Sequence, residues 1–301
     1  MEAGTSYKKL HEHSAPSQVF FPANFQELFS TWSRFPEAIP YAGGTDLIRN
    51  QGMRVPVLPE YILSLDKIEE LKNITRTEKY IEMGAMVRLN EIINLGKIVP
   101  VILTKTLEGI GGSLIRNLAT IGGNLCHHSY RMDASAPMTA LDALYELRTA
   151  SSARWVSSSR FFAVPGKIAL EPQELLTRIR VPLDEWTYSV YRKFKPQGSD
   201  ESGGVMVFLL KNQKDTLTDL RIVYTRSIIL HDRNSETFLI GKQLPLKKKE
   251  ALVFLDKWRQ YLNDMADTMI SHKYHFEQVN ISQLSAQIMA FIENLILEIT
   301  E

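Results

Sequence analysis

Two glycine doublets constrain the fold of this chain more than any other feature of its sequence. They lie in "AGGTD" at 42–46 and "TIGGN" at 120–124, each close to a predicted apolar strand. Adjacent glycines allow positive φ and keep side chains away from the backbone. Successive N–H groups can then converge on an anion, and Thr45 and Thr120 add hydroxyl donors. Two such turns could hold a diphosphate between them. Alternatively, each is an ordinary tight turn, for which Gly-Gly and Gly-Asn are common dipeptides.

Polar residues follow the second doublet. Asn124 can cap a turn or donate through its amide, and Asp133 comes nine residues later. A carboxylate beyond a phosphate loop can accept hydrogen bonds from ribose hydroxyls or an adenine amine. Alternatively, Asp133 is an N-cap for the apolar segment that follows it. No "GK[ST]" follows the glycines and no G-x-G-x-x-G opens a strand–helix unit, which argues against P-loop and Rossmann sites.

Charge and cysteine content exclude several classes of function. The 301 residues include 35 basic and 34 acidic side chains, a net charge of +1, so we expect no nucleic-acid partner. The single cysteine, Cys126, excludes an internal disulfide framework and an iron–sulfur cluster held by this chain's own cysteines. The N-terminal segment lacks an apolar signal core and no apolar run is long enough to span a membrane. We therefore expect a cytoplasmic protein without a membrane partner.

Hydrophobic periodicity predicts an α+β unit up to about residue 182, with strands and helices in alternation. Within it we predict a helix capped by Asn24, a helix over roughly 97–113 and a strand ending at Pro182. The segments "TYSVYRKFK", "GVMVFLLKN" and "LTDLRIVYTRSI" then predict three antiparallel strands. From Leu246 onward the pattern is helical.

His127 and His128 beside Cys126 could suggest a metal site. Three consecutive ligands cannot readily surround one ion, and no partner cluster with zinc spacing occurs elsewhere, so we predict no metal. Cys126 shows no feature of a nucleophile, and we name no catalytic residue. The aromatic residues Tyr188, Tyr191 and Phe194, which alternate imperfectly along the first of the three predicted strands, are expected in the core.

Several segments together resemble the molybdopterin dehydrogenase flavin-binding family. They are "AGGTDL", "IRNLATIGGNL" with Asp133 beyond it, "P-x-x-A-L-D-A", "FFAVPGKIALEPQELLTRIRVP", "YRKFK" and "ETFLIGKQLP". These proteins are the FAD-carrying medium subunits or domains of the xanthine dehydrogenase and carbon monoxide dehydrogenase group. The resemblance implies an FAD-binding domain over 14–182, with two lobes of the vanillyl-alcohol-oxidase type that meet near residue 70. It also implies a C-terminal domain over 183–301, with a three-stranded antiparallel sheet and helices.

The resemblance also implies the residues of the FAD site. The first pyrophosphate loop would be Ala42, Gly43, Gly44, Thr45 and Asp46, and the second would be Thr120, Ile121, Gly122, Gly123 and Asn124. Asp133 would lie at the adenosine end, Ile110 and Leu176 near the flavin ring, and Lys193 as a polar contact near the isoalloxazine. The family commonly has an arginine after the "YRKFK" strand, whereas this chain has none between Lys195 and Val205.

The function implied is electron relay by an FAD subunit of a molybdenum hydroxylase. Iron–sulfur clusters on a partner chain would supply electrons, and NAD or another acceptor would take them. The molybdopterin and 2Fe–2S centres would lie on a large and a small partner subunit. Two alternatives remain: a binding or assembly module that kept the fold without redox turnover, and a stand-alone flavin oxidoreductase.

Overall fold

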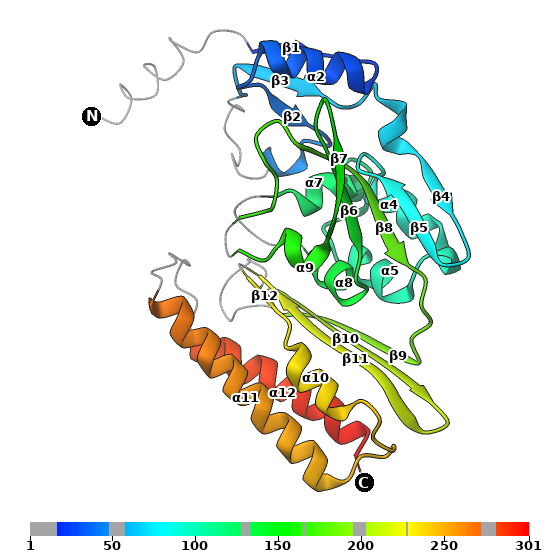
Figure 1. Cartoon of the computed structure of the whole chain (residues 1–301), viewed down its shortest axis with the longest axis vertical. Coiled ribbons are helices and arrows are strands. Elements are labelled where there is room, and N and C mark those ends of the chain that lie inside the picture. Colours follow the sequence, from blue (N-terminus) through cyan, green and yellow to red (C-terminus); the bar gives the residue numbers. More distant parts are fainter. Residues whose placement is uncertain are drawn as a thin grey trace.

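The computed structural model describes residues 17–47, 58–127, 133–164, 167–194, 203–226, 228–271 and 281–300. Three β-sheets follow one another along the longest axis of the molecule, with helices beside and between them (Figure 1). Every helix within these ranges is too short or too polar to span a bilayer. The arginine-free segment between Lys195 and Val205 lies largely outside the described residues, so its consequence stays open.

The first sheet is parallel, in the order β1-β3-β2, and is formed by β1 (Gln18–Phe20), β2 (Ile39–Tyr41) and β3 (Tyr61–Ser64). The helix α2 (Phe25–Arg34) connects β1 to β2. Its predicted cap is confirmed, because the Asn24 side chain accepts a hydrogen bond from the N–H of Glu27 at 2.9 Å.

The second sheet is antiparallel, in the order β4-β5-β8-β6-β7. Its strands are β4 (Ile74–Arg76), β5 (Tyr80–Gly84), β6 (Leu144–Arg148), β7 (Ala153–Ser157) and β8 (Leu175–Pro182). The prediction that a strand ends at Pro182 is confirmed. The chain changes from the first sheet to the second between Ser64 and Ile74.

Short helices connect the strands of the second sheet. They are the 3₁₀ turns η1 (Glu69–Lys72) and η2 (Gly96–Ile98), and α4 (Leu89–Asn94), α5 (Val101–Glu108), α6 (Ser113–Arg116), α7 (Ile121–Leu125), α8 (Ser135–Ala140) and α9 (Ser158–Phe161). The single helix predicted over 97–113 is therefore wrong. Val99 precedes a proline, which favours the extended conformation observed there. Gly111, at φ +49, then separates α5 from α6.

The C-terminal sheet has four strands rather than the three predicted, in the order β12-β11-β10-β9. They are β9 (Tyr188–Lys193), β10 (Val205–Gln213), β11 (Thr216–Thr225) and β12 (Ile229–Leu230). The three long strands are antiparallel as predicted. The fourth has only two residues, which is too short for an alternating pattern to reveal. The core position predicted for Tyr188 is wrong: at the first residue of β9 its side chain is 38% exposed, and its hydroxyl donates to Glu298 at 3.0 Å.

Both faces of this sheet are buried. Val207, Leu209 and Val223 belong to the core that includes the first two sheets. Side chains from the alternate positions, such as Phe208 and Ile222, belong to a second core with the C-terminal helices. These helices are α10 (Arg233–Leu239), α11 (Lys248–Ser271) and α12 (Ile281–Glu298). The sheet therefore joins the N-terminal unit to the helices through apolar surfaces on both sides.

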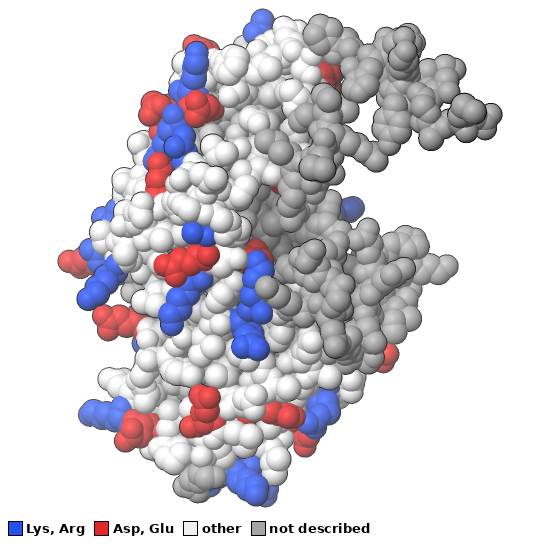
Figure 2. Space-filling model, turned by 180° about the vertical axis from the view of Figure 1, so that it is seen from behind, with Lys and Arg blue, Asp and Glu red and all other residues white. Residues whose placement is uncertain are grey.

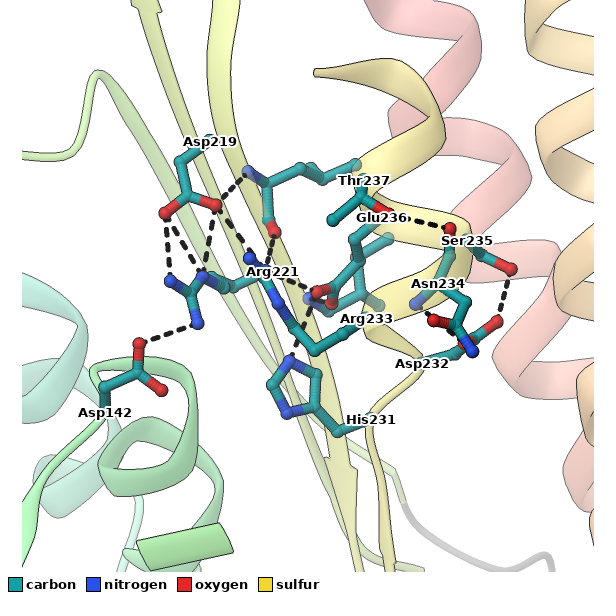
Figure 3. Close-up of polar contacts among 12 residues, drawn as sticks. Asp142, Asp219, Arg221, His231, Asp232, Arg233, Asn234, Ser235, Glu236 and Thr237 are labelled. Carbon is teal, nitrogen blue, oxygen red and sulfur yellow. Dashed lines mark hydrogen bonds and ion pairs between the residues drawn. The ribbon is translucent and has the colours of Figure 1, made fainter. Parts of the chain in front are cut away.

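The helix α10 covers the part of β11 that β12 leaves unpaired (Figure 3). The Glu236 carboxylate accepts the N–H of Ile222 at 2.5 Å, and Arg233 donates to the carbonyl of Leu220 at 2.8 Å. Two charged side chains thus satisfy backbone groups that would otherwise form an open sheet edge.

A further ion pair crosses from the C-terminal sheet to the N-terminal unit (Figure 3). Arg221 on β11 contacts Asp142 at 2.7 Å, and Asp219 on the same strand accepts two more of its hydrogen bonds. Asp142 follows α8 and has φ +53, a conformation that aspartate and asparagine tolerate better than most residues.

Candidate cofactor site

The first glycine doublet follows β2, and its backbone has no room for side chains. A Cβ at Gly43 would lie 1.9 Å from the carbonyl oxygen of Leu118. At Gly44, where φ is +66, a Cβ would lie 2.0 Å from the hydroxyl of Tyr41. Larger residues would therefore push this loop away from the segment that precedes the second doublet.

The N–H groups of Gly43, Gly44 and Thr45 form no hydrogen bond within the described part of the chain. These residues are partly exposed, and residues 45–47 form the start of a helical turn. The first loop therefore offers backbone donors to a ligand, as the sequence predicts for an anion-binding turn.

The second doublet lies in a short helix rather than in the turn that the sequence predicts. Thr120 caps the short helix α7, and its buried hydroxyl accepts the N–H of Gly123 at 3.1 Å. The N–H of Gly122 donates to Ala85 at 2.8 Å, and that of Ile121 donates to Val87 at 2.9 Å. The N–H groups of this loop are thus already bonded within the protein, because they hold α7 against the second sheet. The expectation that they converge on a ligand in the same way as those of the first loop is not met.

The two glycine loops lie side by side. A Cβ at Gly123 would be 3.8 Å from the Cβ of Ala42, and Gly43 contacts Leu118 and Ala119. His127, directly after α7, bonds to Asp46 with 2.7 Å between Nε2 and Oδ2. A segment of the first sheet and a segment of the second therefore meet at this point, as a shared ligand requires.

Asp133 and Lys193 also meet, although the resemblance implies positions at opposite ends of the cofactor. Lys193 Nζ donates to Asp133 Oδ2 at 2.5 Å and to the carbonyl of Gly109 at 3.1 Å. Asp133 therefore lies beside Lys193 and the Gly109–Ile110 segment. Which part of FAD each of the two residues contacts stays a prediction.

Contacts connect this ion pair to the second loop. The Asn124 side-chain oxygen accepts the N–H of Ala134 at 3.4 Å, next to Asp133. Ile110 is partly buried against the larger core, whereas Leu176 on β8 is only 2% exposed. Leu176 is thus covered by protein atoms, and its role as a flavin contact stays a prediction.

Tyr191 lies close to Gly109 and Asp133 and is a candidate site residue that the sequence did not reveal. Its hydroxyl is buried without a hydrogen-bond partner among the described residues, and a Cβ at Gly109 would lie 2.3 Å from it. Burial, with the nearby charge of Asp133, raises the pKa of this hydroxyl. The side chain was expected in the core because the alternation of apolar residues along a strand predicts which face is buried. That alternation does not show whether a buried hydroxyl finds a hydrogen-bond partner. A buried polar atom of this kind is costly unless a ligand or water satisfies it.

Cys126 is the C-cap residue of α7. Burial raises the pKa of the Cys126 thiol to about 12, which opposes thiolate formation. Within the described residues, no group of three His, Cys, Asp or Glu side chains could hold a metal ion. His128 lies outside those residues.

These features fit FAD. A diphosphate needs hydrogen-bond donors, which the first loop provides without a lysine. A polar ring system needs donors and acceptors within an apolar wall, and Lys193, Asp133 and the unpaired Tyr191 hydroxyl lie together beside Ile110.

Comparison with known proteins also indicates an FAD-binding domain. The profile of the family described as FAD binding domain in molybdopterin dehydrogenase matches residues 15–184, more than half of the chain. The sequence is 27% identical over 252 residues to the glyceraldehyde dehydrogenase medium chain of Sulfolobus acidocaldarius, covering 82% of this chain and 88% of that protein. It is 30% identical over 275 residues to the nicotinate dehydrogenase FAD-subunit of Eubacterium barkeri, covering 87% and 92%.

The fold is also similar to a solved structure. Carbon monoxide dehydrogenase from Hydrogenophaga pseudoflava, in a form that lacks the Mo-pyranopterin moiety of the molybdenum cofactor, aligns with a TM-score of 0.75. The alignment covers 94% of this chain and 96% of that one at 20% identity, which shows a shared fold. The family profile, the relatives and the fold agree, and the chain belongs to the family that carries the FAD-binding domain of molybdopterin dehydrogenases.

Proposed function

We propose that this chain is the FAD-binding subunit of a molybdenum hydroxylase in the cytoplasm. Its FAD would receive electrons from 2Fe–2S clusters on a small partner subunit and pass them to NAD or another acceptor. A large partner subunit would carry the molybdopterin. The names of the relatives, a medium chain and an FAD-subunit, support a role within a larger enzyme. When bound, FAD supplies the redox chemistry, and the chain supplies binding and orientation.

The observation that carries the proposal is the contact between the two glycine loops, together with three N–H groups of the first loop that form no hydrogen bond with any described residue. Gly43, Gly44 and Thr45 would donate to the diphosphate. The second loop would support them, because its own N–H groups are bonded and its glycines allow close approach. The Asn124 side-chain amide remains as a further donor from that loop.

Lys193, Asp133 and Tyr191 would contact the flavin part of the cofactor. Lys193 can donate, Asp133 can accept, and the Tyr191 hydroxyl has no hydrogen-bond partner among the residues that the structure describes. Ile110 would provide an apolar wall next to them. The first loop follows the first sheet and the second loop bonds to the second sheet, which supports FAD held between two lobes as in the vanillyl-alcohol-oxidase type.

The absorbance spectrum of the purified full chain tests FAD binding. We expect a yellow protein, or a colourless one that takes up FAD on incubation and quenches its fluorescence. A chain that stays colourless after incubation with FAD contradicts the proposal and favours the assembly module.

The relay needs a separate experiment on the intact complex. We expect the chain purified from its source to bring with it two partner chains, molybdenum and iron. Reduction of the flavin by substrate only in the complex supports the relay. A flavin-loaded chain that purifies alone and oxidises a small alcohol favours the stand-alone oxidoreductase instead.

On the face shown in Figure 2, basic and acidic side chains lie interspersed, with broad uncharged areas between them.

A further inference from the structure

The contact between His127 and Asp46 is not explained by the apolar cores, although it joins two distant parts of the chain. The residues are 81 positions apart, and their side chains approach to 2.7 Å. The His127 side chain is only 9% exposed, whereas that of Asp46 is 35% exposed. A partly buried imidazole is therefore directed at a carboxylate of the first glycine loop.

We propose that His127 is a positioning residue that holds the first glycine loop in the conformation that binds the FAD diphosphate. This inference rests on the proposed function, since it assigns the ligand of that loop. A carboxylate only accepts hydrogen bonds, so the proton of this bond lies on Nε2 of His127. His127 thereby becomes a member of the site through its effect on Asp46.

Geometry gives the reason for such a tie. Near Gly43 the loop is fixed by its contact with Leu118, and near Ala42 it lies next to Gly123. Asp46 lies beyond both glycines, at the other end of the loop, and its hydrogen bond with His127 holds that end in place. The unbonded N–H groups of Gly43, Gly44 and Thr45 lie between these fixed points. A loop held at both ends loses less conformational entropy on binding, which increases affinity. The hydrogen bond from His127 also keeps the Asp46 side chain in one orientation.

Two substitutions of similar size separate the hydrogen bond from the packing. In His127→Gln, the side-chain amide nitrogen occupies a position close to that of Nε2 and can still donate to Asp46. In His127→Asn, the shorter amide places its nitrogen near the position of Nδ1 and does not reach. We expect His127→Asn and Asp46→Ala each to weaken FAD binding by the full chain about tenfold, the equivalent of one hydrogen bond to a charged group. His127→Gln should stay within about twofold of the unmodified chain.

A double-mutant cycle measures whether the two residues act together. We expect the His127→Asn/Asp46→Ala protein to bind FAD no more weakly than either single variant. The ³¹P NMR signals of bound FAD should shift in His127→Asn and stay in place in His127→Gln. Independent, multiplying effects of the two substitutions, or a loss in His127→Gln as large as in His127→Asn, would overturn the proposal.

A measurement without FAD distinguishes failure of this inference from failure of the proposed function. In the ¹⁵N-histidine-labelled, FAD-free chain, we expect His127 to show a protonated Nε2 whose N–H signal is lost in Asp46→Ala. The signal is assigned by its absence in His127→Gln. An Nε2 signal that Asp46→Ala leaves unchanged overturns the tie even if the chain binds FAD. A signal that Asp46→Ala removes, in a chain that does not bind FAD, shows that the tie exists but overturns the proposed function and, with it, the ligand assigned to the loop.

Discussion

Lys193 on β9 donates to Asp133 at the start of the segment that leads into α8, with 2.5 Å between Nζ and Oδ2. At the other end of α8, Asp142 contacts Arg221 on β11. The same short helix is therefore joined to the C-terminal sheet at both ends. Through these contacts the C-terminal sheet contributes Lys193 and Tyr191 to the candidate FAD site.

Replacing Lys193 tests whether its ammonium group contributes to FAD binding. Lys193→Met keeps much of the apolar stem and removes a charged donor, so we expect FAD to bind about tenfold more weakly or worse. Titration of the FAD-free chain with FAD, followed by fluorescence quenching, measures this. Lys211→Met is the matched control, because Lys211 lies on the same sheet and, among the described residues, its ammonium group pairs only with the exposed Asp184, at 3.5 Å. Equal losses in both variants would show that Lys193 has no special role.

Alanine at Gly43 tests the contact between the two loops. Its Cβ would overlap the Leu118 carbonyl, so we expect Gly43→Ala to displace the first loop and weaken FAD binding at least about tenfold. Gly112→Ala is the control, since a Cβ there meets nothing within 4 Å and φ is −89. Unchanged FAD affinity in Gly43→Ala would mean that the ligand does not contact this loop.

Tyr191→Phe tests the unpaired hydroxyl. Without FAD, removal of an unsatisfied buried group should leave the free energy of unfolding unchanged or raise it by up to about 1 kcal/mol. FAD binding should weaken, because the cofactor would lose a hydrogen-bond partner. In Tyr145→Phe, the lost hydroxyl donates to Ser158 at 3.0 Å, and we expect a loss of about 1 kcal/mol without FAD. Urea unfolding distinguishes the two, and an equal loss in both contradicts the interpretation of Tyr191.

Asp142 tests the ion pair that joins the C-terminal sheet to the N-terminal unit. Asp142→Asn removes the charge and keeps a residue that tolerates φ +53. The change in the free energy of unfolding in this variant therefore measures mainly the loss of the contact with Arg221. Asp142→Ala removes the charge and adds backbone strain of about 1 kcal/mol. We therefore expect Asp142→Ala to lower the free energy of unfolding by about 1 kcal/mol more than Asp142→Asn, in thermal or urea unfolding. Identical values would show that the left-handed conformation has no energetic importance.

Glu146 should make stability depend on acid pH. Burial raises the pKa of Glu146, but hydrogen bonds from Arg178 and Thr177 outweigh burial and hold the pKa below its ordinary value of 4.5. The stabilisation is therefore present above the pKa of the unfolded state and is lost as pH falls through the lower pKa of the folded state. At pH 7 we expect Glu146→Gln to lower the free energy of unfolding by about 1–3 kcal/mol.

The difference between Glu146→Gln and the unmodified chain should shrink as pH falls below 4.5. Urea unfolding between pH 7 and 3.5 measures it. Glu69→Gln changes a side chain that is 78% exposed and serves as the surface control. A difference that stays constant down to pH 3.5 would contradict the role given to the Glu146 carboxylate.

Parts of the fold were predictable because burial leaves a local pattern in the sequence. Asn24 begins α2, Pro182 ends β8, and the three long C-terminal strands lie where alternation places them. β12 and α10 were missed. The first is two residues long, and the second is held by the charged residues Arg233 and Glu236 against a sheet edge that only the folded chain creates.

The sequence by itself determined the family, through its glycine loops and the spacing of Asp133 beyond them, and with it the cofactor. Only the tertiary structure decided which residues meet. It brought the side chain of Asp133 to Lys193, 60 positions away, and that of His127 to Asp46. It also buried the Tyr191 hydroxyl next to Gly109, without a hydrogen-bond partner in the described part of the chain. The physical reason is that a pattern of apolar and polar residues reports whether each position is buried, whereas hydrogen bonds depend on distances that exist only once the three sheets have assembled.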